Sequence, residues 1–147
     1  MLEKCSPFEN MVLYSLNKDV TTCEEAASAK GIPLQNELKS LIIDTSIGLY
    51  LLNIPGDKLA NLRSIKKAIK VKEAFLAGED ILSRLKVEAG TVTPLLSRIW
   101  NIPQLLSLDV LEYDFVSTNA GTHNKYIIFN PTILKSHPNT TTGYFSK

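Results

Sequence analysis

Hydrophobic residues along this chain of 147 residues come in short runs that are separated by polar, Gly- or Pro-containing segments. Runs of this length, bounded by turn residues, are typical of strands. The pattern predicts strands over residues 11–16, 40–44, 49–54, 74–77, 105–108, 115–118 and 126–129. Residues 45–48 have the composition of a hairpin turn, and residues 119–121 form a second predicted turn.

Three other segments carry helix signals. Thr21 or Thr22 can cap a helix over residues 23–30, which Gly31 ends. Asp57 is predicted to cap a second helix, with one apolar face made of Leu59, Leu62, Ile65 and Ile69. A third helix is predicted over residues 78–85. Because hairpins alternate with helices, we expect one mixed α+β domain around one sheet, residues 1–138, followed by a polar tail, residues 139–147.

Composition narrows the class of protein. Hydrophobic residues make up 44% and charged residues 21%, as in ordinary globular domains. No apolar run approaches the roughly 20 residues of a membrane span. Two cysteines, Cys5 and Cys23, are too few for a disulfide framework, and the first residues lack the apolar core of a signal peptide. We therefore expect a cytoplasmic protein with reduced thiols and no membrane partner.

The net charge of +1 conceals a basic segment. Residues 45–98 carry nine basic and five acidic groups. The excess gathers on the second predicted helix, at Arg63, Lys66, Lys67 and Lys70. Two interpretations stay open, a solvated helix face or a local binding surface for a polyanion.

Several familiar catalytic motifs are absent from the sequence. No Cys/His spacing suits zinc, and there is no G-x-G-x-x-G, no P-loop and no G-x-S-x-G. The two histidines, His123 and His137, leave little room for a histidine-based site. We therefore predict a site without metal or cofactor.

Four segments, in order and at these spacings, carry a resemblance. They are residues 22–27 with Gly31 after them, the lysine before an apolar strand in residues 38–43, the G-x-x-x-P loop of residues 90–94, and residues 116–121. Residues 55–59 add a matching turn. Over roughly residues 11–135 the chain resembles the YbaK/prolyl-tRNA synthetase-associated domain family, which comprises aminoacyl-tRNA editing domains.

The resemblance implies a fold and an activity. Members are single α+β domains with a mixed, strongly curved, partly barrel-like sheet and helices packed around it. They act as trans-editing deacylases, which hydrolyse the ester between a wrong amino acid and the 3′ end of a tRNA without a metal. Water attacks the ester carbonyl with help from the 2′-hydroxyl of the terminal ribose. The implied partners are the acceptor end of aminoacyl-tRNA and an aminoacyl-tRNA synthetase, with no DNA.

Three residues are predicted to be catalytic: Lys39, Gly90 and Asn119. The Lys39 ammonium would hold a terminal phosphate or polarise the substrate, although a strand-edge lysine often only snorkels. Gly90 would let backbone N–H groups approach an oxyanion, although the loop can equally be a plain connection. Asn119 offers an amide donor and acceptor, although asparagine is also favoured in tight turns.

Further residues are predicted to bind substrate or tRNA. The substrate-binding set is Thr91, Val92, Thr93, Pro94, Ser117, Thr118, Gly121 and His123. Because side chains alternate along a strand, only one of Ser117 and Thr118 can face a pocket. The tRNA-binding set is Arg63, Lys66, Lys67 and Lys70, with Arg98 as an additional contact.

Two features leave alternatives open. Some relatives have an aspartate shortly after the turn glycine, where this chain has Asn124, Lys125 and Tyr126. The alternative function is therefore a non-catalytic module of the same fold, which binds tRNA, a nucleotide or an amino acid. Cys23, in the first turn of a predicted helix, has either a lowered pKa or a plain packing role.

Overall fold

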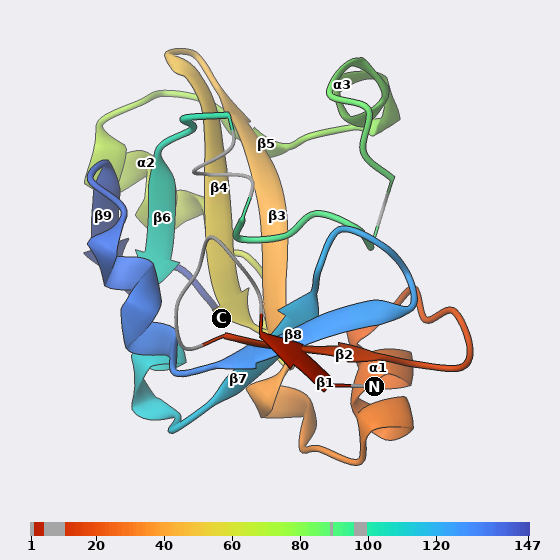
Figure 1. Cartoon of the computed structure of the whole chain (residues 1–147). Coiled ribbons are helices and arrows are strands. Elements are labelled where there is room, and N and C mark those ends of the chain that lie inside the picture. The colour runs from red at the N-terminus through yellow and green to blue at the C-terminus, as the bar shows by residue number, and fades with distance from the viewer. Residues whose placement is uncertain (1, 5–10, 89, 96–99) are drawn as a thin grey trace.

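The computed structural model describes residues 2–4, 11–88, 90–95 and 100–147. Within them the chain forms two open sheets (Figure 1). The antiparallel sheet has the order β1 (Leu2–Lys4), β2 (Val12–Ser15), β8 (Lys125–Phe129) and β7 (Val116–Asn119). The mixed sheet has the order β5 (Ala74–Leu76), β3 (Leu38–Thr45), β4 (Gly48–Pro55), β6 (Gln104–Ser107) and β9 (Thr140–Gly143). In Figure 1, β3 and β4 stand upright, and β2 and β8 run across their lower ends.

Short helices connect and cover the strands. They are α1 (Cys23–Lys30), α2 (Leu62–Ile69) and α3 (Glu79–Arg84), with 3-10 turns η1 (Leu34–Asn36), η2 (Leu108–Glu112) and η3 (Pro131–Ser136). None of the helices in the described ranges is both long and apolar enough to cross a membrane.

The first helix forms where it was predicted, and local sequence signals explain both of its ends. The Thr22 hydroxyl accepts a hydrogen bond from the Glu25 backbone N–H at 3.1 Å, which is an N-cap. Gly31 ends α1 in the left-handed conformation, with φ +72°. The β3–β4 hairpin also forms where it was predicted, with Thr45 opposite Gly48.

The second helix starts later than predicted, so Asp57 is not its cap. Leu59 instead exchanges two backbone hydrogen bonds with Lys147, which keeps this segment extended. The cap is Asn61, whose Oδ1 accepts from the Ser64 N–H at 3.2 Å. Leu59 is consequently 65% exposed, outside the apolar face to which it was assigned.

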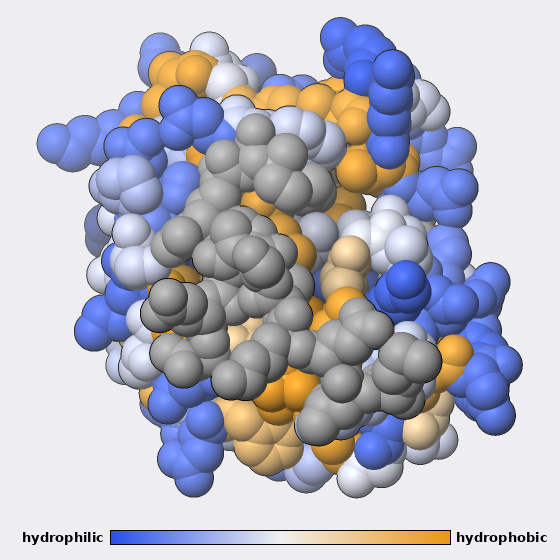
Figure 2. Space-filling model, viewed as in Figure 1, coloured by the Kyte–Doolittle hydropathy of each residue, from blue (hydrophilic) through white to orange (hydrophobic). Residues whose placement is uncertain are grey.

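Each face of the mixed sheet packs on a different part of the molecule. Ile43, Leu52, Ile54 and Leu105 pack with Ile65 of α2 on one face. A second cluster joins the opposite face to the antiparallel sheet, and it contains Leu38, Leu106, Val116, Ile127 and Phe129. Apolar residues also reach the surface at the top of Figure 2, over the β3–β4 hairpin and β5, where Ile47 and Phe75 are exposed.

The mixed α+β single domain is confirmed, but two of its predicted features are corrected. The described strands form two open sheets and neither is closed or strongly curled, so the single sheet and the barrel-like curvature are wrong. The prediction that residues 139–147 form only a polar tail is also wrong. Three β-branched threonines, 140–142, pair with β6 as the parallel strand β9, and Phe145 beyond them is 1% exposed.

Candidate functional site

A cavity of about 310 Å³ opens where α1 meets the two sheets. Its walls come from the segment that leads into α1, from α1 itself, from residues 37–41, and from the β7–β8 connection. Six of the predicted site residues line it: Lys39, Gly90, Val92, Thr118, Asn119 and His123. Sequence segments about fifty and eighty positions apart therefore converge on one hollow.

The cavity lies against an uncovered stretch of the β3 edge. β5 pairs with β3 only at residues 43–45, and Ala77 donates its N–H to the Ile42 carbonyl just below. At the other end, Glu37 forms an isolated bridge with Ser117 of β7. Between these points, no described strand pairs with residues 38–41 on that side. All four residues of this unpaired stretch, 38–41, line the cavity.

Lys39 lies on this open stretch and is tied to the next turn of the chain. Its Nζ donates to the main-chain carbonyl of Lys58 at 2.7 Å, and its side chain is half-buried. The turn that carries Lys58 is held in turn to Glu37, because Gly56 N–H donates to the Glu37 carbonyl at 2.7 Å. Lys39 therefore lines the cavity while its ammonium is held against the Lys58 carbonyl.

Cys23 also lines the cavity, at the start of α1. Burial raises the pKa of its thiol to about 11, and the nearby Lys39 ammonium only partly opposes this. Of the two alternatives for Cys23, the raised pKa favours the packing role over a lowered pKa at the helix start. A thiol with this pKa stays protonated at neutral pH and is a poor nucleophile.

Gly90 is required by its surroundings. Its φ is +85°, in the left-handed region, and a Cβ atom there would lie 2.7 Å from the Thr21 carbonyl oxygen. Any other residue would push the loop away from the start of α1. The absence of a side chain thus lets the loop close one wall of the cavity.

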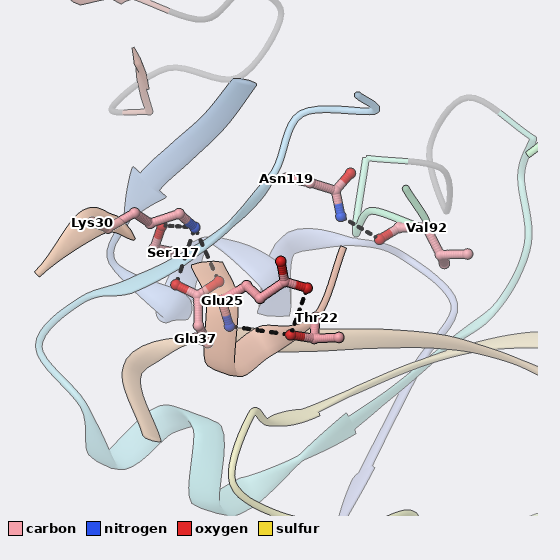
Figure 3. A network of polar contacts seen from close by, with 7 residues as sticks. All are labelled: Thr22, Glu25, Lys30, Glu37, Val92, Ser117 and Asn119. Carbon is pink, nitrogen blue, oxygen red and sulfur yellow. Dashed lines mark hydrogen bonds and ion pairs between the residues drawn. The ribbon is translucent and has the colours of Figure 1, made fainter. Parts of the chain in front are cut away.

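Asn119 links this loop to the β7–β8 turn. Its Nδ2 donates to the Val92 carbonyl at 2.8 Å (Figure 3). Its Oδ1 accepts from the Gly121 N–H at 2.8 Å. Both ends of the side-chain amide thus contact backbone. Gly121, with φ +97°, supplies the turn that makes the second bond.

A buried ion pair that the sequence did not reveal lies in the cavity wall. Lys30 Nζ lies 3.0 Å from each carboxylate oxygen of Glu37 and 2.9 Å from Ser117 Oγ (Figure 3). The two charged side chains are only 2% and 4% exposed. The ammonium also lies 4.5 Å from the centre of the Tyr126 ring, which stacks on Tyr14. The pair ties the last turn of α1 to both sheets.

Burial affects the two partners in opposite directions. It lowers the pKa of Lys30 and raises the pKa of Glu37, and each charge counters the effect on the other. In the sequence, Lys30 has the position of an ordinary cation at a helix end. A usable signal was Glu37 itself, a carboxylate next to a predicted buried strand.

Comparison with known protein families assigns the chain to one family. Residues 17–136 match the aminoacyl-tRNA editing domain. The chain belongs to the aminoacyl-tRNA editing domain family. This confirms the resemblance, and the matched range contains every residue that lines the cavity except Leu16.

Relatives of the editing domain agree with this assignment. Proline–tRNA ligases of two Xanthomonas campestris pv. campestris strains are 34% identical over 74 residues, half of this chain but 13% of the ligase. The solved structure of a hypothetical protein, APE2540, has a TM-score of 0.83 and 26% identity, covering 92% of this chain and 90% of that one. A candidate trans-editing enzyme for prolyl tRNA synthetase shares the fold, with a TM-score of 0.80, 22% identity and coverages of 96% and 89%.

Other predicted substrate-binding residues of the editing domain lie outside the cavity lining: Thr91, Thr93, Pro94, Ser117 and Gly121. The Thr91 hydroxyl, for example, donates to the Glu88 carbonyl at 2.7 Å and shapes the loop. Of the two adjacent hydroxyl residues, Thr118 lines the cavity and Ser117 accepts from Lys30, as strand alternation requires.

Several charged and polar groups of the editing domain lie in or near the cavity wall. His123 Nδ1 lies 3.9 Å from a Glu88 carboxylate oxygen. Asn124, which stands where some relatives have an aspartate, accepts a hydrogen bond from Thr122, while Lys125 lines the cavity. No residue of α2 lines it, and Arg98 and Cys5 lie outside the described residues. No group of three or more His, Cys, Asp or Glu in the described ranges could hold a metal ion.

Proposed function

We propose that the protein is a trans-editing deacylase, which hydrolyses the ester between a wrong amino acid and the 3′ end of a tRNA. The observation that carries this proposal is the convergence of Lys39, Gly90 and Asn119 on one cavity of an editing-domain fold. The likeness to proline–tRNA ligase and to a candidate trans-editing enzyme makes tRNA(Pro) the first tRNA to test.

The proposal gives these residues separate tasks. The Lys39 ammonium polarises the ester carbonyl or holds the phosphate of the terminal nucleotide. Backbone N–H groups of the loop at Gly90 stabilise the oxyanion, since nothing projects from Gly90 to block them. Asn119 acts through this loop, which it holds by its bond to Val92. Of the other residues that line the cavity, Thr118 and His123 contact the aminoacyl end.

The reaction needs only water as a second reactant. The water oxygen bonds to the ester carbonyl carbon, and the bond from that carbon to the ribose 3′-oxygen breaks. The proton lost by water passes to the 3′-oxygen with the help of the 2′-hydroxyl. The products are a free amino acid and a tRNA with both ribose hydroxyls. Because an aminoacyl ester is already activated, positioning and oxyanion stabilisation suffice without a metal.

The proposal places the tRNA backbone on α2. Arg63, Lys67 and Lys70 are exposed and Lys66 is half-buried, on the side of the helix away from Ile65. Since α2 does not border the cavity, these cations would contact the tRNA away from its acylated end. Such contacts add affinity without sequence specificity.

The test is a deacylation assay on a panel of aminoacyl-tRNAs, beginning with tRNA(Pro) that carries amino acids other than proline. Wild-type protein is compared with Lys39→Ala, with Lys39→Arg, and with Lys135→Ala, a matched change of an exposed lysine on η3. We expect at least one mischarged tRNA to be hydrolysed. We expect Lys39→Ala to reduce the rate by about 100-fold, an effect of the size seen when one oxyanion donor is lost, and Lys135→Ala to have no effect.

Two results would count against the proposal in different ways. Tight binding of tRNA with an unchanged ester half-life would favour the non-catalytic module of the same fold. Full activity of Lys39→Ala would leave the deacylase in place but remove Lys39 from its mechanism.

A further inference from the structure

A row of neutral polar side chains crosses four neighbouring strands of the mixed sheet. Ser40 Oγ donates to Asn53 Oδ1 at 2.5 Å, and Asn53 Nδ2 donates to Gln104 Oε1 at 2.7 Å. Gln104 Nε2 then donates to Thr140 Oγ1 at 2.9 Å. Asn53 and Gln104 are 0% and 1% exposed, so water does not replace these bonds. Only one end of the row, Ser40, lines the cavity.

Main-chain carbonyls at the far end decide which way every bond in the row points. Gln104 Nε2 also donates to the Leu134 carbonyl at 2.8 Å, and a carbonyl can only accept. The amide oxygen of Gln104 must therefore face Asn53, which has to donate its Nδ2. The Asn53 oxygen is then left facing Ser40. The Thr140 hydroxyl gives its own proton to the His137 carbonyl at 2.8 Å, so it can only accept from Gln104.

This direction has a consequence at the cavity. The Ser40 hydroxyl carries one proton, and Asn53 Oδ1 takes it. Toward the cavity the Ser40 oxygen can therefore only accept a hydrogen bond. Bonds aligned head to tail in a buried region also polarise one another, which makes that oxygen a better acceptor.

We propose that Ser40 is a substrate-contact residue of fixed polarity, which accepts a hydrogen bond from an N–H or O–H donor of the bound aminoacyl-adenosine end. Two groups there have this chemistry, the α-ammonium of the amino acid and the ribose 2′-hydroxyl. Asn53 and Gln104 are positioning residues, which act by holding the Ser40 proton away from the cavity. This inference rests on the proposed function, because the ligand it describes is the acylated tRNA end.

The experiment measures binding, so that it does not depend on hydrolysis. Three stable analogues of the acylated terminal adenosine are used, in which an amide replaces the ester. The first analogue has both donors, the second lacks the α-amino group, and the third lacks the 2′-hydroxyl. Calorimetry gives the dissociation constant of each with the wild type, Ser40→Ala and Ser40→Thr.

We expect Ser40→Ala to weaken binding of the first analogue by about 10-fold or more, as for a hydrogen bond to a charged group. Binding of one other analogue should not change, and the donor it lacks is then the one that contacts Ser40. Ser40→Thr keeps the hydroxyl and should bind all three like the wild type. If Ser40→Ala does not fold, Ser40→Cys takes its place, since a thiol is a weak acceptor.

Equal weakening of all three analogues by Ser40→Ala would overturn the contact, because that pattern marks a general packing defect. The proposed function would still stand, since the wild type binds. Failure of the wild type to bind any analogue would overturn both, because the ligand class itself would then be wrong.

Discussion

Two buried polar groups lie beside the cavity. They differ in whether protein atoms already take up the hydrogen bonds at both of their ends. Lys30 has three N–H donors, and the two oxygens of Glu37 and the hydroxyl of Ser117 take all of them. The row from Ser40 to Thr140 is neutral. Only at its Thr140 end do main-chain carbonyls accept its hydrogen bonds, from the Gln104 amide and the Thr140 hydroxyl. At its other end an oxygen lone pair faces the site.

The difference separates structural roles from binding roles. The Lys30 ammonium has no N–H left to donate to a ligand, and removing one partner of the pair leaves an uncompensated charge. A directional neutral row can keep one end for a ligand at little cost in desolvation. The charged pair is therefore expected to govern stability, and the neutral row to govern recognition as well.

The largest effect on stability is expected from removing one charge of the buried Lys30–Glu37 pair. Glu37→Gln leaves the Lys30 ammonium buried without a counter-charge, and it should lower the free energy of unfolding by about 3–5 kcal/mol. Adding Lys30→Met should recover a large part of the loss. Urea unfolding of the wild type, the single variant and the double variant measures this. A loss under about 1 kcal/mol for Glu37→Gln would show that the pair is not desolvated.

Replacing a hydrogen-bond donor of the neutral row by an acceptor should have the next largest effect on stability. Asn53→Asp puts a carboxylate oxygen against the Gln104 oxygen, which cannot turn away from Asn53 without losing its bond to Leu134. We expect a loss of about 2–3 kcal/mol at neutral pH, the cost of a buried unpaired acceptor. Asn130→Asp is the matched control, because exposed Asn130 only accepts, from Thr132. Equal stability of the two variants would contradict the direction assigned to the row.

A smaller effect is expected at Asn119, which joins the loop to the turn. Asn119→Asp keeps the bond from Gly121 but cannot donate to the Val92 carbonyl. The free energy of unfolding should fall by about 1–2 kcal/mol. Deacylation should fall by about 10-fold or more, since the loop wall is no longer fixed. A large stability loss without a change in rate would show that the loop takes no part in the reaction.

The Cys23 thiol reports on the burial of the start of α1. Its pKa of about 11 is above the ordinary thiol value of 9.0, so its thiolate is scarce at neutral pH. A raised pKa contributes stability below pH 9 that is lost as the pH rises toward 11. In a Cys5→Ser background, alkylation by iodoacetamide at pH 8 should be about 100-fold slower than for a free thiol. Rapid alkylation at pH 8 would mean that the start of α1 is open to water.

The smallest effect on stability is expected on α2, where no buried network is involved. Replacing Lys66, Lys67 and Lys70 by glutamine should change the free energy of unfolding by less than about 0.5 kcal/mol. The slope of tRNA affinity against salt should flatten by about one for each lysine that binds a phosphate in the wild type. An unchanged slope would show that this face of α2 is merely solvated.

Most elements could be predicted because their signals are local. Thr22 and Gly31 mark the two ends of α1 by themselves, and the β3–β4 hairpin follows from its turn. The start of α2 was misplaced, because the bonds between Leu59 and Lys147 join residues far apart in the sequence. The tail was misjudged for the same reason, since threonines pair as β9 only when β6 is present.

The amino-acid sequence by itself determined most of the secondary structure, the family and which residue types could serve the site, because caps, turns and hydrophobic periods act over a few residues. The tertiary structure alone decided that there are two open sheets, that Lys30 meets Glu37, and that the Ser40 proton points away from the cavity. The reason is physical. The direction of a buried hydrogen bond depends on the acceptor at the far end of its chain, and here that acceptor, the Leu134 carbonyl, lies about ninety residues further along.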